Sequence, residues 1–189
     1  MKIKLDYFAY FVILLIAISC QKKTTIYDVL ECKSSNSFTH TKTLRDVKNH
    51  FEINIGENWK RELYYDDYQS RIYAADTTKS YSSSFIVDIT RFKGKIIIEK
   101  TFQEQLIKTI KEKKNHFIIK EGFVDFKEQK SYTMFSFQKK EEQQTYTLEC
   151  YVPSGEFYYL LTSTINGSDD LANNVLESLQ VFNSLKILP

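Results

Sequence analysis

Glycine is scarce in this chain: there are five in 189 residues, and each stands alone. A loop that cradles phosphate groups needs several closely spaced glycines, so the sequence holds no nucleotide-binding loop of that kind. The motifs His-Glu-x-x-His, Gly-x-Ser-x-Gly and Cys-x-x-Cys are absent too. We therefore expect no cofactor, no metal site and no catalytic residue.

Histidine is also scarce. The three histidines, His40, His50 and His116, are isolated in the sequence and lack the close spacing of metal ligands. An envelope hydrolase, which we keep as an alternative, would require His50, His116 and acidic residues to lie close together in the folded protein. The main expectation is that the protein is not an enzyme.

The chain has no large excess of charge of one sign. Its formal net charge is +2, of which Lys2, Lys4 and Asp6 together contribute +1. Lysine and glutamate are mixed along the rest of the chain, as on a solvated surface. Nucleic acid is bound through a basic surface, so we expect no nucleic-acid partner.

The main apolar run is too short for a membrane-spanning helix. It extends from Tyr7 to Ser19 and ends at the polar residues Gln21-Lys22-Lys23, whereas a span needs about 20 apolar residues. A positive start, a short apolar run and small residues at its end are the layout of a secretory signal peptide.

The end of this run, Ala17-Ile18-Ser19-Cys20, resembles the lipobox of bacterial lipoproteins, although that family prefers Leu where this chain has Ala17. The resemblance implies that Cys20 becomes the first mature residue and carries acyl chains such as palmitate. The protein would then be anchored in a membrane of the bacterial cell envelope and face the periplasm or the cell exterior. The alternative is an ordinary cleaved signal in which Cys20 has no special role.

Three segments follow from these patterns. Residues 1–19 are predicted to be the signal peptide. Residues 20–46, rich in Gln, Lys, Ser and Thr, are predicted to be a flexible tether with one short ordered piece at Ile26–Leu30. Residues 47–189 have the length of a single domain.

Alternating apolar and polar residues predict strands through most of that domain. The segments are 50–55, 69–76, 82–92, 116–129, 130–140, 145–152, 156–165 and a short edge strand within 183–189. A helix is predicted from Thr101, with Glu104 completing a capping box, and a second over 168–182, capped by Ser168 or Asp169. The order predicts an α+β fold: an antiparallel sheet of about six strands packed with two main helices.

The segment "HFEINIGENWKRE", His50 to Glu62, resembles the opening of PsbP-like domains, in which an alternating strand leads into a turn and a tryptophan. The family usually has Pro where this chain has Gly56. The same plan continues through the helix, the strand meander and the last helix, from Phe51 to Ile187. The resemblance implies a sheet sandwiched with helices. Members of the family act mostly as binding modules, although a shared fold does not by itself establish a shared function.

The stretch "LYYDDYQSR", Leu63 to Arg71, is the most unusual surface segment. One interpretation is a loop that recognises a protein or a glycan, because tyrosine is a large, stiff contact residue with one polar tip. The loop residues are Tyr64, Tyr65, Asp66, Asp67 and Tyr68. The alternative, which we favour, is that some tyrosines pack on the sheet while the aspartates form a turn, because tyrosine is common at half-buried sheet margins. The oxygen-ligand spacing of a calcium loop is absent.

A disulfide between the two further cysteines, Cys32 and Cys150, is a possible feature of the fold. An exported protein can oxidise such a pair. Cys150, however, alternates with Leu148 and Val152 on one strand face, which is typical of a buried thiol. The sequence does not decide between the two.

The function expected from these features is that of a non-enzymatic envelope lipoprotein that binds a protein partner or acts in assembly. The 14 Phe and 13 Tyr also suggest an alternative, a small apolar ligand between sheet and helices. The envelope hydrolase is the third candidate.

Overall fold

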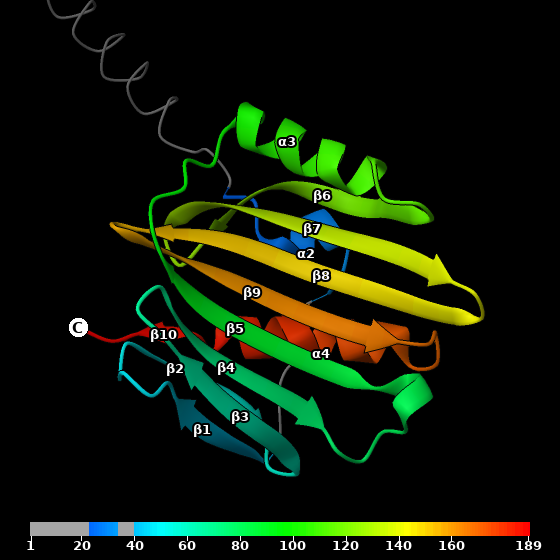
Figure 1. Ribbon diagram of the computed structural model, residues 1–189, viewed down its shortest axis with the longest axis horizontal. Helices are drawn as coiled ribbons and strands as arrows, with labels where there is room; N and C mark the ends of the chain where they lie inside the picture. Colours follow the sequence, from blue (N-terminus) through cyan, green and yellow to red (C-terminus); the bar gives the residue numbers. More distant parts are fainter. Residues whose placement is uncertain (1–22, 34–39) are drawn as a thin grey trace, which may run out of the picture.

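Antiparallel strands dominate the computed structural model, which describes residues 23–33 and 40–189 (Figure 1). A seven-stranded sheet has the order β3-β4-β5-β9-β8-β7-β6, and a three-stranded sheet has the order β1-β2-β10. The large sheet contains β3 (Trp59–Tyr65), β4 (Gln69–Asp76), β5 (Phe85–Lys93), β6 (His116–Phe126), β7 (Gln129–Lys140), β8 (Gln143–Ser154) and β9 (Phe157–Asn166). The small sheet contains β1 (Thr41–Arg45), β2 (Phe51–Gly56) and β10 (Lys186–Ile187).

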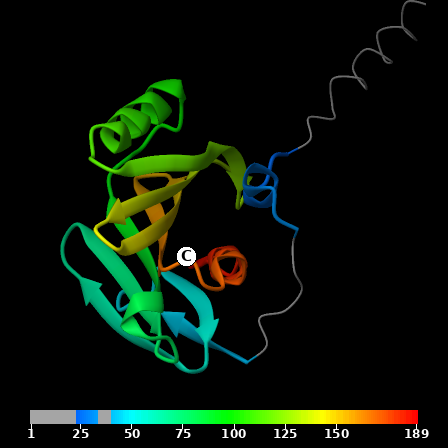
Figure 2. The same ribbon diagram turned by 90° about the vertical axis from the view of Figure 1, so that its right-hand side faces the viewer.

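Three α-helices accompany the sheets in the described part of the chain: α2 (Ile26–Leu30), α3 (Lys100–Lys111) and α4 (Leu171–Asn183). A short 3-10 helix, η1 (Tyr81–Ser83), precedes β5. Helices α3 and α4 lie on opposite sides of the large sheet (Figure 2). The small sheet shares a buried cluster with α4 and one face of the large sheet.

The expectation of about six strands and two main helices needs correction. The predicted alternating segments do form strands, but β2, the first of them, belongs to the small sheet and not to the main one. Strand β3 was not predicted because only Trp59 among its residues is buried. Its position at the edge of the sheet explains this, since an edge strand is often charged and solvated on both faces.

The predicted tether also differs from the structure, because the ordered body begins well before residue 47. Strand β1 pairs along its whole length with β2, and its Leu44 is 1% exposed. Helix α2, the short ordered piece that was expected, packs its Ile26 and Leu30 into the main cluster. Isolated apolar residues in a polar segment carry too weak a pattern to reveal such docking.

The helix starts also differ from the predicted caps. Helix α3 begins at Lys100 after Glu99, so Thr101 lies inside the first turn and no side chain caps the end. Helix α4 begins after Asp170, not after Ser168 or Asp169, and again no side chain caps it. A true capping box instead joins Thr25 and Asp28 at the start of α2.

The core consists of two clusters, one on each face of the large sheet. The larger one gathers alternate residues of β4, β5, β8 and β9 with β2 and α4, and most of these residues are fully buried. The smaller one lies beneath α3 and has four buried members, Ile98, Ile110, Tyr132 and Met134.

In the larger cluster Trp59 meets Phe85 edge to face at 4.9 Å, and a Cβ on Gly56 would lie 2.8 Å from the indole, so this turn needs a glycine.

Candidate functional site

The β3–β4 hairpin carries the five residues predicted to recognise a partner. Tyr64 and Tyr65 are the last residues of β3, and Asp66, Asp67 and Tyr68 form the turn. The three tyrosines are 47%, 61% and 73% exposed, so none of them is buried on the sheet. The predicted loop is therefore a tight hairpin, and the aspartates form the turn as the alternative expected.

Asp66 holds the turn of this hairpin together. Its carboxylate accepts hydrogen bonds from the backbone N–H groups of Tyr68 at 2.7 Å and Gln69 at 2.8 Å. These bonds favour the charged form and lower the pKa of Asp66. The turn thus has a defined backbone shape, which places Tyr68 at its exposed tip.

A buried carboxylate supports the hairpin from behind. Asp46, whose side chain is fully buried, accepts hydrogen bonds from the backbone of Phe51 at 3.0 Å and Lys48 at 3.2 Å and from the hydroxyl of Ser70 at 2.5 Å. Ser70 is on β4 and Asp46 follows β1, so this one side chain joins the two sheets. Lys48 extends the link, because its Nζ donates to the carbonyl of Asp66 at 2.6 Å and lies 5.4 Å from the ring of Tyr65.

His50 lies beside the same network. Its Nδ1 is 3.5 Å from a carboxylate oxygen of Asp46 and 3.3 Å from a guanidinium nitrogen of Arg91. Burial and the neighbouring Arg91 lower the pKa of His50. The hollow at this point holds only about 30 Å³, which is too small for an organic ligand.

The structure does not bring His50 and His116 together. His50 lies next to β5, whereas His116 is on β6, four strands away in the sheet and therefore about 19 Å across it. His116 instead pairs its Nε2 with the hydroxyl of Ser136 at 3.0 Å, and burial lowers the pKa of His116. The geometry that the hydrolase alternative requires is not formed by these residues.

The face of the large sheet next to α3 is only partly covered. Helix α3 lies over the β6–β8 side, and β3, β4, β5 and much of β9 are open in this view (Figure 1). On the open part Arg71 makes two hydrogen bonds with Asp88, one of 2.8 Å from Nε, and its guanidinium lies 5.5 Å from the ring of Tyr73 and 6.0 Å from that of Tyr64. Phe92 and Tyr158 stack at 5.0 Å on the same face.

Sequence reasoning found the hairpin but missed this open face. Tyr64 belongs to both, because it points to the α3 side of the sheet while Tyr65 points to the other. The sequence did hold one signal for this face: Arg71, Tyr73 and Asp88 occupy the positions that alternate with the buried apolar residues of their strands. Arginine and tyrosine are both enriched at protein–protein interfaces relative to the rest of the surface.

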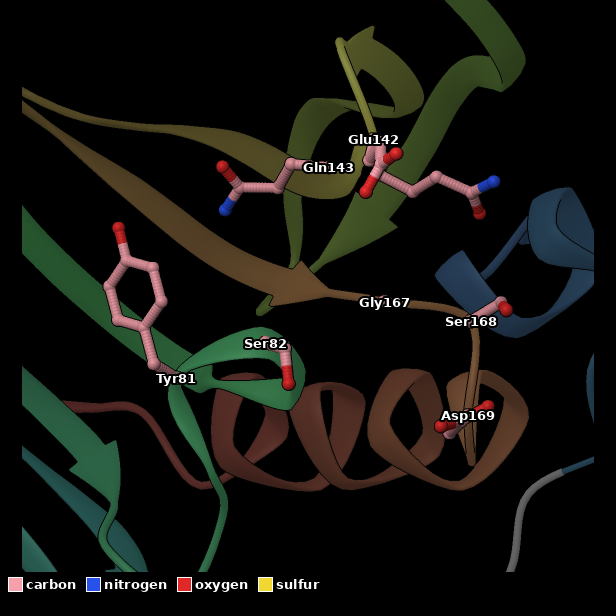
Figure 3. Close-up of a pocket in the computed structure, with 8 residues that line it drawn as sticks. Tyr81, Ser82, Glu142, Gln143, Gly167, Ser168 and Asp169 are labelled. Carbon is pink, nitrogen blue, oxygen red and sulfur yellow. The ribbon is translucent and has the colours of Figure 1, made fainter.

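A second candidate site is a cleft at the other end of the long axis. It has a volume of about 520 Å³ and is lined by Tyr81, Ser82, Glu142, Gln143, Gln144, Gly167, Ser168 and Asp169. Figure 3 shows these residues arriving from η1, the β7–β8 turn and the connection from β9 to α4. Gly167 has φ 76°, and a Cβ there would lie 2.9 Å from the carbonyl oxygen of Ser82, so only glycine fits.

The lining of this cleft is polar and open. Two carboxylates, Glu142 and Asp169, face it, and no lysine or arginine is among the lining residues. The segments Lys139–Glu142 and Asn166–Ser168 were predicted separately as a hairpin tip and a turn. Their meeting depends on the tertiary fold.

The cysteines do not form a disulfide in the structure. Cys32 and Cys150 are both free thiols, and burial raises the pKa of each. Cys150 is completely buried, as its position on an alternating strand predicted. Cys20, the predicted lipid attachment site, lies outside the described residues.

The part of the chain that the structure describes contains neither a metal cluster nor a helix that could span a membrane. Within residues 23–33 and 40–189, no three His, Cys, Asp or Glu side chains are grouped so that they could hold a metal ion. In the same ranges no helix has the length and apolar character needed to cross a bilayer.

Comparison with known proteins defines the fold class. No family model and no curated protein matches the sequence. Among solved structures, the cyanobacterial PsbP protein CyanoP from Synechocystis sp. PCC 6803 superposes with a TM-score of 0.51 at 13% identity, covering 82% of this chain and 98% of its own. The fold is therefore PsbP-like.

Two other structures share this fold. The Ran-binding protein Mog1p of Saccharomyces cerevisiae has a TM-score of 0.52 at 8% identity and covers 78% of this chain and 95% of its own. LpqN of Mycobacterium tuberculosis, described as involved in cell envelope biogenesis, has a TM-score of 0.50 at 9% identity and covers 89% and 100%. At these identities the likeness concerns the fold alone.

Proposed function

We propose that this protein is a non-enzymatic binding or assembly module of the bacterial cell envelope, anchored in a membrane through acyl chains on Cys20. In this proposal a protein partner docks on the β3–β4 hairpin and the neighbouring open sheet face. The observation that carries the proposal is the set of three exposed tyrosines, Tyr64, Tyr65 and Tyr68, on a hairpin held in place by buried hydrogen bonds.

The physical basis is preorganisation. A tyrosine offers a large contact area with few rotatable bonds, so ordering it on binding costs little entropy. The turn made by Asp66 and the link through Lys48 hold the hairpin before any partner arrives. A surface that is already ordered retains more of its contact energy as affinity.

The comparisons are consistent with a binding role but name no partner for this chain. Mog1p is described as Ran-binding and LpqN as acting in envelope biogenesis. Together with the lipobox resemblance around Cys20, these descriptions support a binding module at the envelope. The absence of the common catalytic motifs from the sequence agrees with it.

The partner surface can be tested by cross-linking in intact cells. Replacing Tyr64, Tyr65 and Tyr68 together by Ala should reduce the cross-linked partner at least tenfold, because the side chains are solvent-exposed and their loss leaves the fold intact. Tyr81→Ala is the matched control, since Tyr81 is 85% exposed and lies at the far cleft. Equal cross-linking by the triple variant and the wild type would exclude the hairpin as the binding site.

The anchor has a separate test. Cys20→Ala should move the protein from the membrane fraction to the soluble fraction. Mass analysis of the wild-type protein should show acyl chains on Cys20, the first residue of the mature protein. A variant that still sediments with membranes would contradict the anchor.

A further inference from the structure

The segment that follows Cys20 is docked almost from its start. The carbonyl of Thr24 accepts a hydrogen bond of 2.8 Å from the backbone N–H of Asp125 on β6, and the capping box of Thr25 and Asp28 starts α2 at the next residue. The predicted tether of residues 20–46 therefore contains a fixed point only four residues after Cys20.

Helix α2 secures this fixed point on the domain. Ile26 is 3% exposed in the main cluster, and Asn183 at the end of α4 donates to the hydroxyl of Tyr27 at 2.9 Å. Val29 packs on β6 where Gly122 has no side chain, since a Cβ there would lie 3.2 Å from a Val29 methyl group. Lys120 on β6 also forms an ion pair with Glu31 at 2.5 Å.

The reach of the remaining chain follows from backbone geometry. Thr24 is four residue steps from Cys20, and a fully extended chain spans at most about 3.5 Å per step. The acyl-bearing residue and Thr24 are then at most about 14 Å apart. A flexible tether of 27 residues, in contrast, would let the domain move about 28 Å on average from its anchor.

The fixed point lies toward one end of the long sheet. Asp125 pairs with Lys130 next to the β6–β7 turn, and β7 then runs from this end to the β7–β8 turn beside the polar cleft (Figure 1). Lys130 and Lys140, near the two ends of β7, are about 33 Å apart at 3.3 Å per residue.

From these observations we propose that the end of the domain formed by the β6–β7 turn and α2 lies against the lipid bilayer, and that the polar cleft at the other end is turned away from it. This inference rests on the proposed acyl anchor at Cys20. The near end cannot move more than about 14 Å from the anchoring residue. The cleft reaches the membrane only when the domain lies flat, so it is the more accessible end.

Lys130 and Lys140 provide a matched pair of labelling positions, because both are exposed lysines at the ends of one strand. Each is changed to Cys in a Cys32→Ser background, in which Cys150 is completely buried. The acylated full-length protein is labelled with a fluorophore at the new cysteine and reconstituted in phosphatidylcholine vesicles that contain a lipid with a quencher on its headgroup. We expect quenching at Lys130→Cys to be at least three times that at Lys140→Cys.

A linker variant tests the cause. Insertion of 20 Gly/Ser residues between Lys23 and Thr24 keeps α2 docked and gives the anchor an average reach of about 25 Å. The ratio of quenching should then fall to less than half its original value. A ratio that does not change on insertion would overturn the inference, because the short connection would not be its cause.

The two proposals fail in different ways. Equal quenching at both positions in protein whose acylation is confirmed by mass would overturn the orientation and leave the anchor standing. A mass that shows Cys20 unmodified would overturn the anchor, and the orientation with it.

Discussion

The two faces of the seven-stranded sheet are built differently. On the face toward α4 and the small sheet, alternate residues of β5, β8 and β9, such as Val87, Leu148 and Leu161, are completely buried. On the face toward α3, only a small cluster is buried, and the rest is a partly exposed surface of aromatic and charged side chains. One face therefore carries most of the apolar burial that stabilises the fold.

The two faces should tolerate substitution to different degrees. A substitution on the packed face alters the volume of a dense core, so it is felt by its neighbours. Side chains on the open face are less constrained, so their substitution should perturb the fold less.

The two faces should differ most in stability at a pair of phenylalanines, one on each of the helices that cover them. Phe182 on α4 is completely buried, and Phe182→Ala should lower the free energy of unfolding by about 4 kcal/mol through lost burial and a cavity. Phe102 on α3 is only half-buried, and Phe102→Ala should cost about 1.5 kcal/mol. Urea unfolding measures both values, and equal losses would show that the faces contribute alike.

The next prediction compares two aspartates. Asp46→Ala should destabilise the protein by about 3 kcal/mol, because the backbone N–H of Phe51 and the hydroxyl of Ser70 lose their buried acceptor. Asp88→Ala on the open face should cost at most about 1 kcal/mol, because the partner Arg71 regains water. Thermal unfolding of the two variants decides the order, which would be reversed if the open face were the structural one.

The smallest effect concerns pH. Burial under the α3 side raises the pKa of Glu149 on β8, although Tyr151 and Lys113 oppose the shift. A carboxyl with a raised folded pKa keeps its proton longer in the folded state, so its contribution to stability is greatest below the unfolded pKa of about 4.3 and is lost as pH rises through the folded value.

Glu149→Gln should remove this loss, so that the variant gains stability relative to the wild type as pH rises from 4 to 7. Melting temperatures across that range provide the measurement, with Glu142→Gln at the exposed β7–β8 turn as the control. A Glu149→Gln variant whose stability runs parallel to the wild type at every pH would show that burial does not perturb this carboxyl.

Strands with strong alternation were predictable from sequence. Phe51, Ile53 and Ile55 alternate with polar residues, and all three are completely buried in β2. Strand β1 was not predictable, because Leu44 is the only buried residue in it and a single position has no period. Strand β3, at the edge of the large sheet, was missed for the same reason, because Trp59 is its only buried residue.

The candidate site was predictable only in part. Tyr64, Tyr65 and Tyr68 stand out in the sequence because they flank two aspartates, and the structure leaves all three exposed. The support from Asp46 could not be foreseen, since it reaches Ser70 across 24 residues and between two sheets. The polar cleft likewise joins three turns that are distant in the chain.

The sequence by itself determined the alternation that builds most of the strands, the two longer helices and the tyrosine-rich turn, because these depend on neighbours within a few residues. Only the tertiary structure decided that the segment after Cys20 is docked at Thr24, that β2 leaves the main sheet, and that one sheet face stays open. The physical reason is that each of these depends on contacts between residues far apart in the chain, and such contacts leave no local period.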